Sequence, residues 1–171
     1  LPLLVTLEAR WPQLPGAATE RLFLHSWLRS KLGARVYHDN RQHPGQPLML
    51  INLCQSPMSP QLWLCAWLIG TAGCPVDAFD GPMPLAELPL AISRRRPRAL
   101  LLFCEADSNT DAQSTLQQWL GDHGIPCLLI GIENQQEAEQ LVARAPASAD
   151  VTVVADPLAA LQNLADRHLL E

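Results

Sequence analysis

Most of the side chains that could do chemistry in this chain follow short apolar runs, at the points where a strand would give way to a helix. Carboxylates in such positions can hold a metal ion or carry a proton, and hydroxyls can bind phosphate. The candidate ligand rim consists of Gln55, Ser56, Ser59, Glu105, Asp107, Ser108, Asn109 and Asp156, while Asp80, Glu133 and Asn134 follow the remaining runs. Together these residues would form a polar, mostly acidic edge.

The elements that must position these side chains alternate along the chain. Five apolar runs, at 48–53, 75–79, 99–104, 127–132 and 151–154, alternate with helical patterns at 60–72, 85–96, 110–123, 135–144 and 157–169. Strands that are each followed by a helix pair in parallel through right-handed crossovers. The second run contains Asp77 and is the natural edge strand. We therefore predict a flavodoxin-like, doubly wound α/β sheet in the order 2-1-3-4-5, whose ligands would sit beyond the carboxyl ends of the strands.

A helical segment precedes this sheet. Residues 1–11 have helical apolar spacing, and a second helix is predicted from Thr19, a candidate N-cap, to a stop at Gly33. Pro44, Gly45 and Pro47 then indicate a linker. We predict a helical segment and linker over 1–46 and the α/β domain over 47–171.

The second helix has more apolar surface than one face can hold. Leu22, Phe23, Leu24, Trp27 and Leu28 cover more than one side of it. We expect something outside this chain to cover the excess.

Composition restricts the classes of function. A hydrophobic fraction of 48% and a charged fraction of 17% predict a packed globular domain rather than a disordered tail. The net charge of −5 argues against this chain holding nucleic acid by itself, since such binding needs Lys and Arg on phosphates. One basic cluster, Arg94, Arg95, Arg96 and Arg98, is interpreted either as a cationic last helical turn or as an anion contact.

The cysteines and the hydropathy indicate a reducing compartment. The five cysteines form no C-x-x-C pair, and we interpret them as small buried side chains. No run of 18 apolar residues and no basic-then-apolar leader occurs, so we expect a cytoplasmic protein without a membrane partner. The chain opens on Leu1 rather than Met, which suggests a piece of a longer protein.

The turn after the first apolar run lacks the usual cofactor motifs. Residues 54–60 contain no glycine and no lysine, which excludes a P-loop and a G-x-G-x-x-G dinucleotide site. Asp107 could pass for the acceptor of a phosphorylated receiver domain, but Cys54 and Gln55 cannot supply its metal-binding carboxylates. An FMN site is disfavoured because Pro57 and Pro60 remove backbone donors from this turn.

Catalytic arrangements are missing as well. There is no G-x-S-x-G elbow, and no histidine is placed to activate Ser56. Glu105 and Asp107 are interpreted as caps of the following helix, with a shared proton as the alternative. We therefore expect a protein without catalytic residues.

Three stretches carry a family resemblance: SPQLWLCAWLIGTAGCPVDAF, ALLLFCEADSNTDAQSTLQQWLGDHGI and LLIGI. They resemble the C-terminal half of MerR-type transcriptional regulators with a cobalamin-binding-like domain, and in particular the MlrA-like branch associated with biofilm and curli control. The resemblance covers roughly residues 1–132. It implies a winged helix-turn-helix DNA-binding domain N-terminal to Leu1, which would be the only contact with DNA.

The cobalamin motif of that family is not kept here. Relatives carry a D-x-H-x-x-G loop after the first strand, a Ser or Thr near the end of the third, and paired glycines near the fifth. In this chain the corresponding stretches are CQSPMSP, CEADSN and VVADP. Light-sensing relatives also place a Trp and a Glu-His pair above the cofactor; Trp11 and Glu20 resemble them, but Arg21 stands where the histidine would be. The resemblance thus implies a domain that has lost its cofactor.

Two classes of function remain. The first is a non-catalytic effector and oligomerisation domain of a regulator, which forms a homodimer, contacts another protein or responds to a small-molecule effector. The alternatives are a cobalamin-dependent carrier or enzyme module, and a sensor of another small ligand at the carboxyl edge of the strands.

Overall fold

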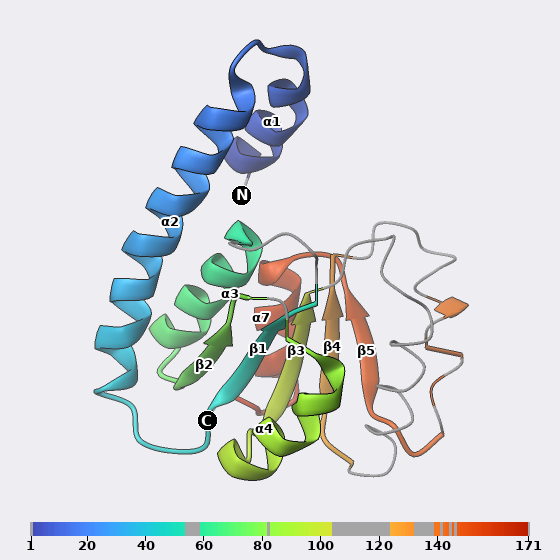
Figure 1. Ribbon diagram of the computed structural model, residues 1–171. Coiled ribbons are helices and arrows are strands. Elements are labelled where there is room, and N and C mark those ends of the chain that lie inside the picture. The colour runs from blue at the N-terminus through green and yellow to red at the C-terminus, as the bar shows by residue number, and fades with distance from the viewer. Residues whose placement is uncertain are drawn as a thin grey trace.

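A parallel β-sheet forms the centre of the molecule. The computed structural model describes residues 2–53, 59–81, 83–103, 124–131 and 147–170, together with residues 139, 140, 142, 143 and 145. Five strands lie in the order β2-β1-β3-β4-β5, and every pairing is parallel (Figure 1). They are β1 (Leu48–Asn52), β2 (Val76–Phe79), β3 (Ala99–Phe103), β4 (Cys127–Ile130) and β5 (Val151–Val154). The predicted flavodoxin-like sheet and its strand order are confirmed.

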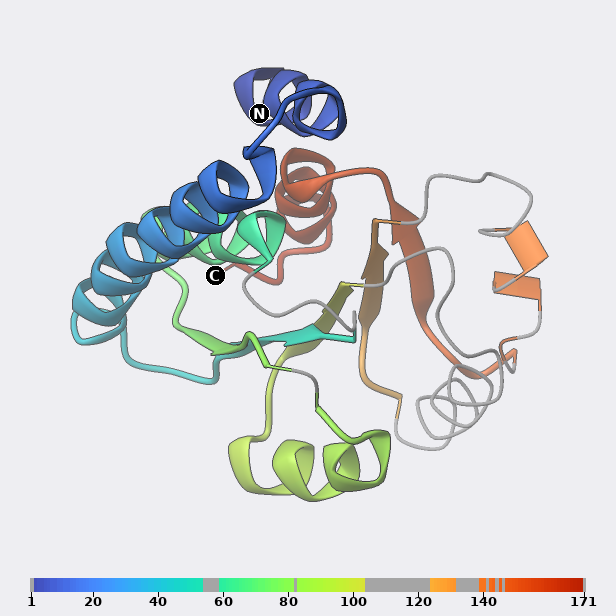
Figure 2. The same ribbon diagram turned by 45° about the horizontal axis from the view of Figure 1, so that its top comes forward.

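Helices cover both faces of this sheet (Figure 2). On one face lie α2 (Ala17–Asn40), α3 (Pro60–Thr71) and α7 (Pro157–Asp166). On the other lies α4 (Leu88–Arg95), preceded by the short 3-10 helix η2 (Leu85–Glu87). The connections place the helices on both sides, as a doubly wound fold requires.

The strands are apolar throughout because each side of the sheet is packed. Along β1, Leu48 and Leu50 belong to the core under α3 and α7, whereas Met49 and Ile51 belong to the core under α4. All four side chains are fully buried. Successive residues of one strand therefore pack into two different cores. This explains why the strand is apolar at every position instead of alternating between apolar and polar residues.

The N-terminal helices form a hairpin that stands out from the sheet beyond the carboxyl ends of its strands (Figure 1). It comprises α1 (Pro2–Arg10), the 3-10 helix η1 (Trp11–Gln13) and the first half of α2. The second half of α2 packs on α3.

Two predictions about the second helix were wrong. It begins at Ala17 after Gly16, whose φ of 76° only glycine adopts readily, so Thr19 is not the N-cap. It also runs through Gly33 to Asn40. At position 33 a side chain would meet the ring of Trp63, with 3.4 Å from the Cβ position to the nearest carbon, so this glycine serves close helix packing rather than a helix end.

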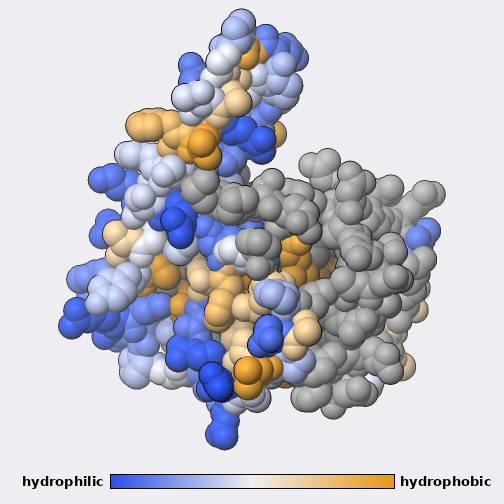
Figure 3. All heavy atoms as spheres, in the orientation of Figure 1, coloured by the Kyte–Doolittle hydropathy of each residue, from blue (hydrophilic) through white to orange (hydrophobic). Residues whose placement is uncertain are grey.

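The predicted excess of apolar surface on α2 is confirmed. Leu22, Phe23 and Trp27 are exposed, while Leu24 and Leu28 are half-buried. Figure 3 shows hydrophobic atoms at the surface of the N-terminal half of α2.

Other sequence predictions have mixed outcomes. Trp63 and Trp67 pack against the core. Cys65, Cys74 and Cys127 are buried, and burial raises the pKa of the Cys65 thiol to about 12. The predicted helix at 110–123 lies outside the described residues, and of 135–144 only residues 139, 140, 142 and 143 are described, all helical. No helix in the described ranges combines the length and apolar character that crossing a bilayer requires.

The last residue of α2 completes the edge of the sheet. The side-chain amide of Asn40 donates to the Val76 carbonyl (2.6 Å), and its oxygen accepts from the Val76 backbone N–H (2.9 Å). Asn40 thus acts as one residue of a missing neighbour strand and satisfies part of the open edge of β2.

We predict that Asn40→Ala lowers the free energy of unfolding by about 1–3 kcal/mol, because both Val76 backbone groups lose a partner. Urea denaturation measures this change. Gln42→Ala is the control, since the exposed side chain of Gln42 bonds to His38 in the last turn of α2, and its removal should change stability by less than about 0.5 kcal/mol. Equal effects of the two substitutions would show that the pairing with Val76 adds nothing.

Candidate functional site

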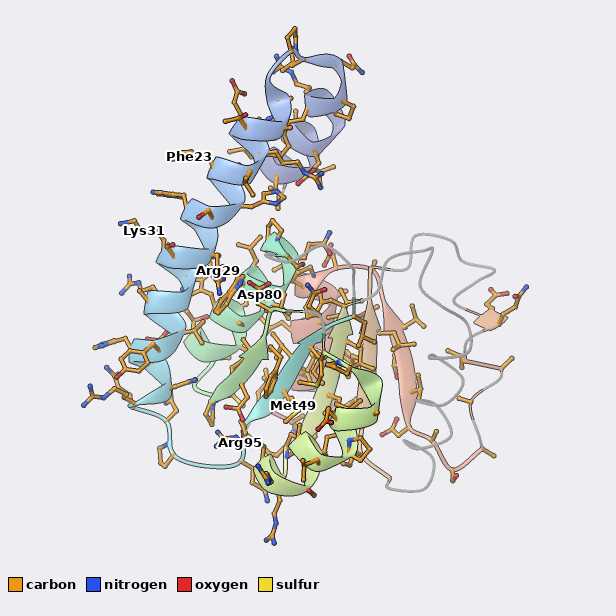
Figure 4. All side chains as sticks on the ribbon, viewed as in Figure 1. Phe23, Arg29, Lys31, Met49, Asp80 and Arg95 are labelled. Carbon is orange, nitrogen blue, oxygen red and sulfur yellow. The ribbon has the colours of Figure 1, made fainter. Side chains whose placement is uncertain are left out.

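A buried carboxylate lies at the carboxyl edge of the sheet, where β2 ends between α2 and α3. Asp80 is only 7% exposed. Its Oδ2 lies 2.9 Å from Nε of Arg29 on α2, and its Oδ1 accepts a hydrogen bond from the Ser59 backbone N–H at 3.1 Å. Figure 4 shows Arg29 and Asp80 directed toward one another. One side chain therefore joins α2, β2 and the start of α3.

The chain brings these groups together through ordinary local preferences. Asn52, fully buried at the end of β1, donates from its side chain to the Asp80 carbonyl at 2.9 Å. Ser59 is the N-cap of α3, and its hydroxyl accepts from the Leu62 N–H at 3.4 Å. Pro60 follows at the first helical position, where its missing N–H costs nothing. The paired carboxyl ends of β1 and β2 place Asn52 and Asp80 at one level.

The two rim residues that the structure describes both act as helix caps. Ser59 begins α3, and Asp156 begins α7 by accepting from the Leu158 and Ala159 N–H groups at 2.8 and 2.9 Å. Their side chains are therefore committed to backbone donors rather than to an open pocket. The other predicted rim residues, Gln55, Ser56, Glu105, Asp107, Ser108 and Asn109, lie outside the described residues, as do Glu133 and Asn134.

A second polar cluster lies inside the helical hairpin, beyond the carboxyl edge. Glu8 of α1 binds two residues of α2: its Oε1 lies 2.8 Å from Nε2 of His25, and its Oε2 lies 2.9 Å from Nε of Arg21. The ring of buried Trp11 meets the His25 ring edge-on, at a centroid distance of 5.8 Å. Trp11, which resembles the tryptophan above the cofactor of light-sensing relatives, and Arg21, which stands where their histidine would be, thus hold the hairpin together.

The described histidines do not lie where the family resemblance would place a cobalt ligand. In the family that the sequence resembles, the imidazole ligand for cobalt comes from the turn after the first strand, and in this chain that turn contains no histidine. The described histidines lie elsewhere: His25 is bonded to Glu8 inside the hairpin, His38 is bonded to Gln42, His43 lies beside Gly73 near the opposite edge of the sheet, and His168 follows the end of α7. Within the described part of the chain, no group of three or more His, Cys, Asp or Glu side chains could hold a metal ion.

The arginine cluster lies at the amino edge of the sheet and is partly used in structural contacts. Arg94 and Arg95 end α4, as the helical interpretation predicts. Arg95 makes a two-pronged ion pair with Asp77, with Nη2 2.8 Å from Oδ1, and this hydrogen bonding raises the pKa of Arg95. Arg98 donates from Nη2 to the Cys74 sulfur at 2.8 Å. Burial raises the pKa of the Cys74 thiol, and Arg98 works against that rise.

Comparison of this chain with protein-family models and with curated proteins found no match. The family resemblance noted in the sequence therefore stays a prediction. The candidate site is a cluster at the carboxyl edge of the sheet, where α2 is bound to the buried carboxylate of Asp80. It consists of Arg29, Asn52, Ser59 and Asp80.

We predict unequal effects for two arginines that are almost equally exposed, Arg29 at 53% and Arg95 at 55%. Arg29→Ala should lower the free energy of unfolding by roughly 1–3 kcal/mol, because it leaves the buried Asp80 carboxylate with fewer partners. Arg95→Ala should cost less than about 1 kcal/mol, as surface ion pairs do.

Hydrogen exchange distinguishes the two sites further. In Arg29→Ala, amides of α2 should exchange faster while those of β1 and β3 keep their protection. The same exchange pattern in both variants would contradict a special role for the Asp80 contact.

Proposed function

We propose that this chain is the effector and oligomerisation part of a MerR-type transcriptional regulator and that it catalyses no reaction. In this proposal the protein is cytoplasmic, and a winged helix-turn-helix domain preceding Leu1 makes the contacts with DNA. The net charge of −5 agrees with that division of roles, because the chain has little positive charge to offer phosphates.

The observation that carries the proposal is the Arg29–Asp80 contact. Asp80 stands at the edge where doubly wound sheets receive their ligands, and Arg29 lies on the helix that leads back toward the N-terminus. A change at this edge that alters the partners of Asp80 therefore acts directly on α2. A regulator needs such a connection between a sensing edge and a helix that leads to DNA-binding heads.

The helix can transmit that change along its length. Arg29 is near the middle of the 24-residue α2, and the hairpin with α1 lies on its N-terminal side. An α-helix moves as a rod over such distances, so a small shift at Arg29 displaces the hairpin as a whole. Two heads attached to such hairpins would change their spacing on a pseudo-palindromic operator.

A sensor of a small ligand other than cobalamin is the second candidate. Its support is the half-exposed guanidinium of Arg29, which a ligand at the carboxyl edge could reach while Asp80 stays buried. A ligand that binds there would compete with Asp80 for Arg29 and loosen α2. This candidate is a particular form of the effector role.

A reporter assay tests the proposed function. We fuse the chain to a helix-turn-helix head that binds its operator only as a dimer, and we expect repression that the head alone does not give. Joining two heads raises operator affinity because the second half-site is then bound intramolecularly. A fusion that is soluble and expressed but does not repress would contradict the oligomerisation role.

A cofactor assay separates this proposal from the cobalamin-dependent alternative. The chain is incubated with hydroxocobalamin, passed over a desalting column and examined by its visible spectrum. We expect no retained corrin absorbance, and the same result for Ser56→His, because one imidazole does not restore the glycines that accommodate the nucleotide tail. Stoichiometric retention by the unaltered chain would favour a cobalamin carrier, and retention by Ser56→His alone would show that only the histidine is missing.

A further inference from the structure

The helix that packs on the α/β domain has a second, outward-facing row of side chains. Its members recur at alternating intervals of three and four residues, and all of them are exposed. We call this row the outer stripe; it consists of Glu20, Phe23, Trp27, Ser30, Ala34 and Tyr37. The inward side of the same helix carries half-buried Leu28 and Leu32 and buried Val36. Figure 4 shows Phe23 pointing away from the domain.

The spacing and size of the outer stripe are those of a helix-pairing surface. Intervals of three and four residues keep side chains on one seam when two helices lie side by side. Phe23 is 71% exposed, Tyr37 67% and Trp27 48%. At roughly 200 Å² for each aromatic side chain, these fractions leave about 370 Å² of aromatic surface along one helix face, which is the size of the largest apolar patches of monomers, and those patches are often functional.

From this pattern we infer that the chain forms a twofold-symmetric dimer in which the outer stripes of two α2 helices pack antiparallel. The inference rests on the proposed oligomerisation role and names its surface. The occupant of the stripe is a second copy of this chain because the stripe complements itself when it is reversed, as a twofold interface requires.

The reversed stripes match large side chains with small ones. In an antiparallel seam, Phe23 of one copy lies opposite Ala34 of the other, and Trp27 lies opposite Ser30. Symmetry makes each of these pairs occur twice. A small residue leaves room for the aromatic ring that faces it, so the two helices can approach closely without strain.

The polar groups at the two ends of the outer stripe are consistent with the same antiparallel alignment. Tyr37 of one copy lies opposite Glu20 of the other, where its hydroxyl can donate to the carboxylate. A parallel pairing would instead set Phe23 on Phe23, Trp27 on Trp27 and one Glu20 carboxylate against the other. Bulky rings would then compete for one space, and like charges would oppose each other.

Sedimentation equilibrium of the 171-residue chain over a hundred-fold range of concentration tests the interface. We expect a monomer–dimer equilibrium, and in Trp27→Glu a rise of about tenfold or more in the dimer dissociation constant, because a buried aromatic anchor is replaced by a charge. Leu90→Glu is the matched control: Leu90 is 47% exposed but lies on α4, and its replacement should leave the constant unchanged. Circular dichroism spectra that match the unaltered chain show that each variant is folded.

Disulfide trapping tests the orientation. Phe23→Cys with Ala34→Cys in one chain should give a covalent dimer on mild oxidation. Within one helix these positions are roughly 16 Å apart, too far for an internal bond. Phe23→Cys alone should cross-link poorly, because the antiparallel alignment separates the two copies of position 23 by roughly 16 Å, and the unaltered chain controls for the native cysteines. Efficient cross-linking of Phe23→Cys alone would overturn the antiparallel arrangement, because only a parallel pairing brings the two copies of position 23 together.

The outcomes separate the two levels of the proposal. A dimer that Trp27→Glu leaves intact would overturn the outer stripe as its interface while the oligomerisation role stands. A chain that stays monomeric at every concentration would overturn the stripe interface and remove the support for that role as well. Weakening by Trp27→Glu, together with cross-linking of the double variant but not of Phe23→Cys alone, would support the antiparallel dimer.

Discussion

The close approach of α2 to α3 fixes the position of everything N-terminal to the sheet. Two glycines make that approach: Gly33 of α2 lies against the ring of Trp63, and Gly70 of α3 lies against the side chain of Asp39, each with 3.4 Å from its Cβ position to the nearest atom. At Gly33 a side chain larger than a methyl group would have to displace the Trp63 ring. Because the second half of α2 makes this contact, it also determines the direction in which the hairpin projects.

The polar contacts of α2 fix its position on the domain more than they add to the free energy of unfolding. An ion pair between a buried carboxylate and a half-exposed arginine gains little net free energy, since removing charge from water offsets the attraction. Breaking it is costly, however, because the buried Asp80 would keep its charge with fewer partners. The same reasoning applies to Asn40, whose amide matches the donor and acceptor of Val76 at the other end of the contact. Together they hold α2 at two levels of the sheet.

The sheet was predictable because strands buried on both sides must be apolar, as in β1 and β3, and because each was followed by a helical pattern. The length of α2 was not predictable from Gly33, since a glycine that ends a helix and one that admits a ring look alike in sequence. At the site, the sequence correctly placed Ser59 and Asp156 after the ends of strands. Their role as helix caps was not predicted, because it depends on the backbone N–H groups of the residues that follow them. Arg29 was missed because its partner lies far along the chain, and only the docking of α2 brings them together.

The two sides of α2 connect the proposed sensing edge with the proposed interface. Arg29, on one side, is held by Asp80, while Trp27 and Ser30 of the outer stripe lie within one turn of it on the other side. A helix that rotates or shifts to release Asp80 must move both rows together, because its backbone hydrogen bonds keep it rigid. In a twofold dimer the same movement occurs in both copies at a shared seam. A small movement of α2 in each copy would therefore change the shared interface from both sides. A dimer would respond to a change at the carboxyl edge more strongly than a single chain could.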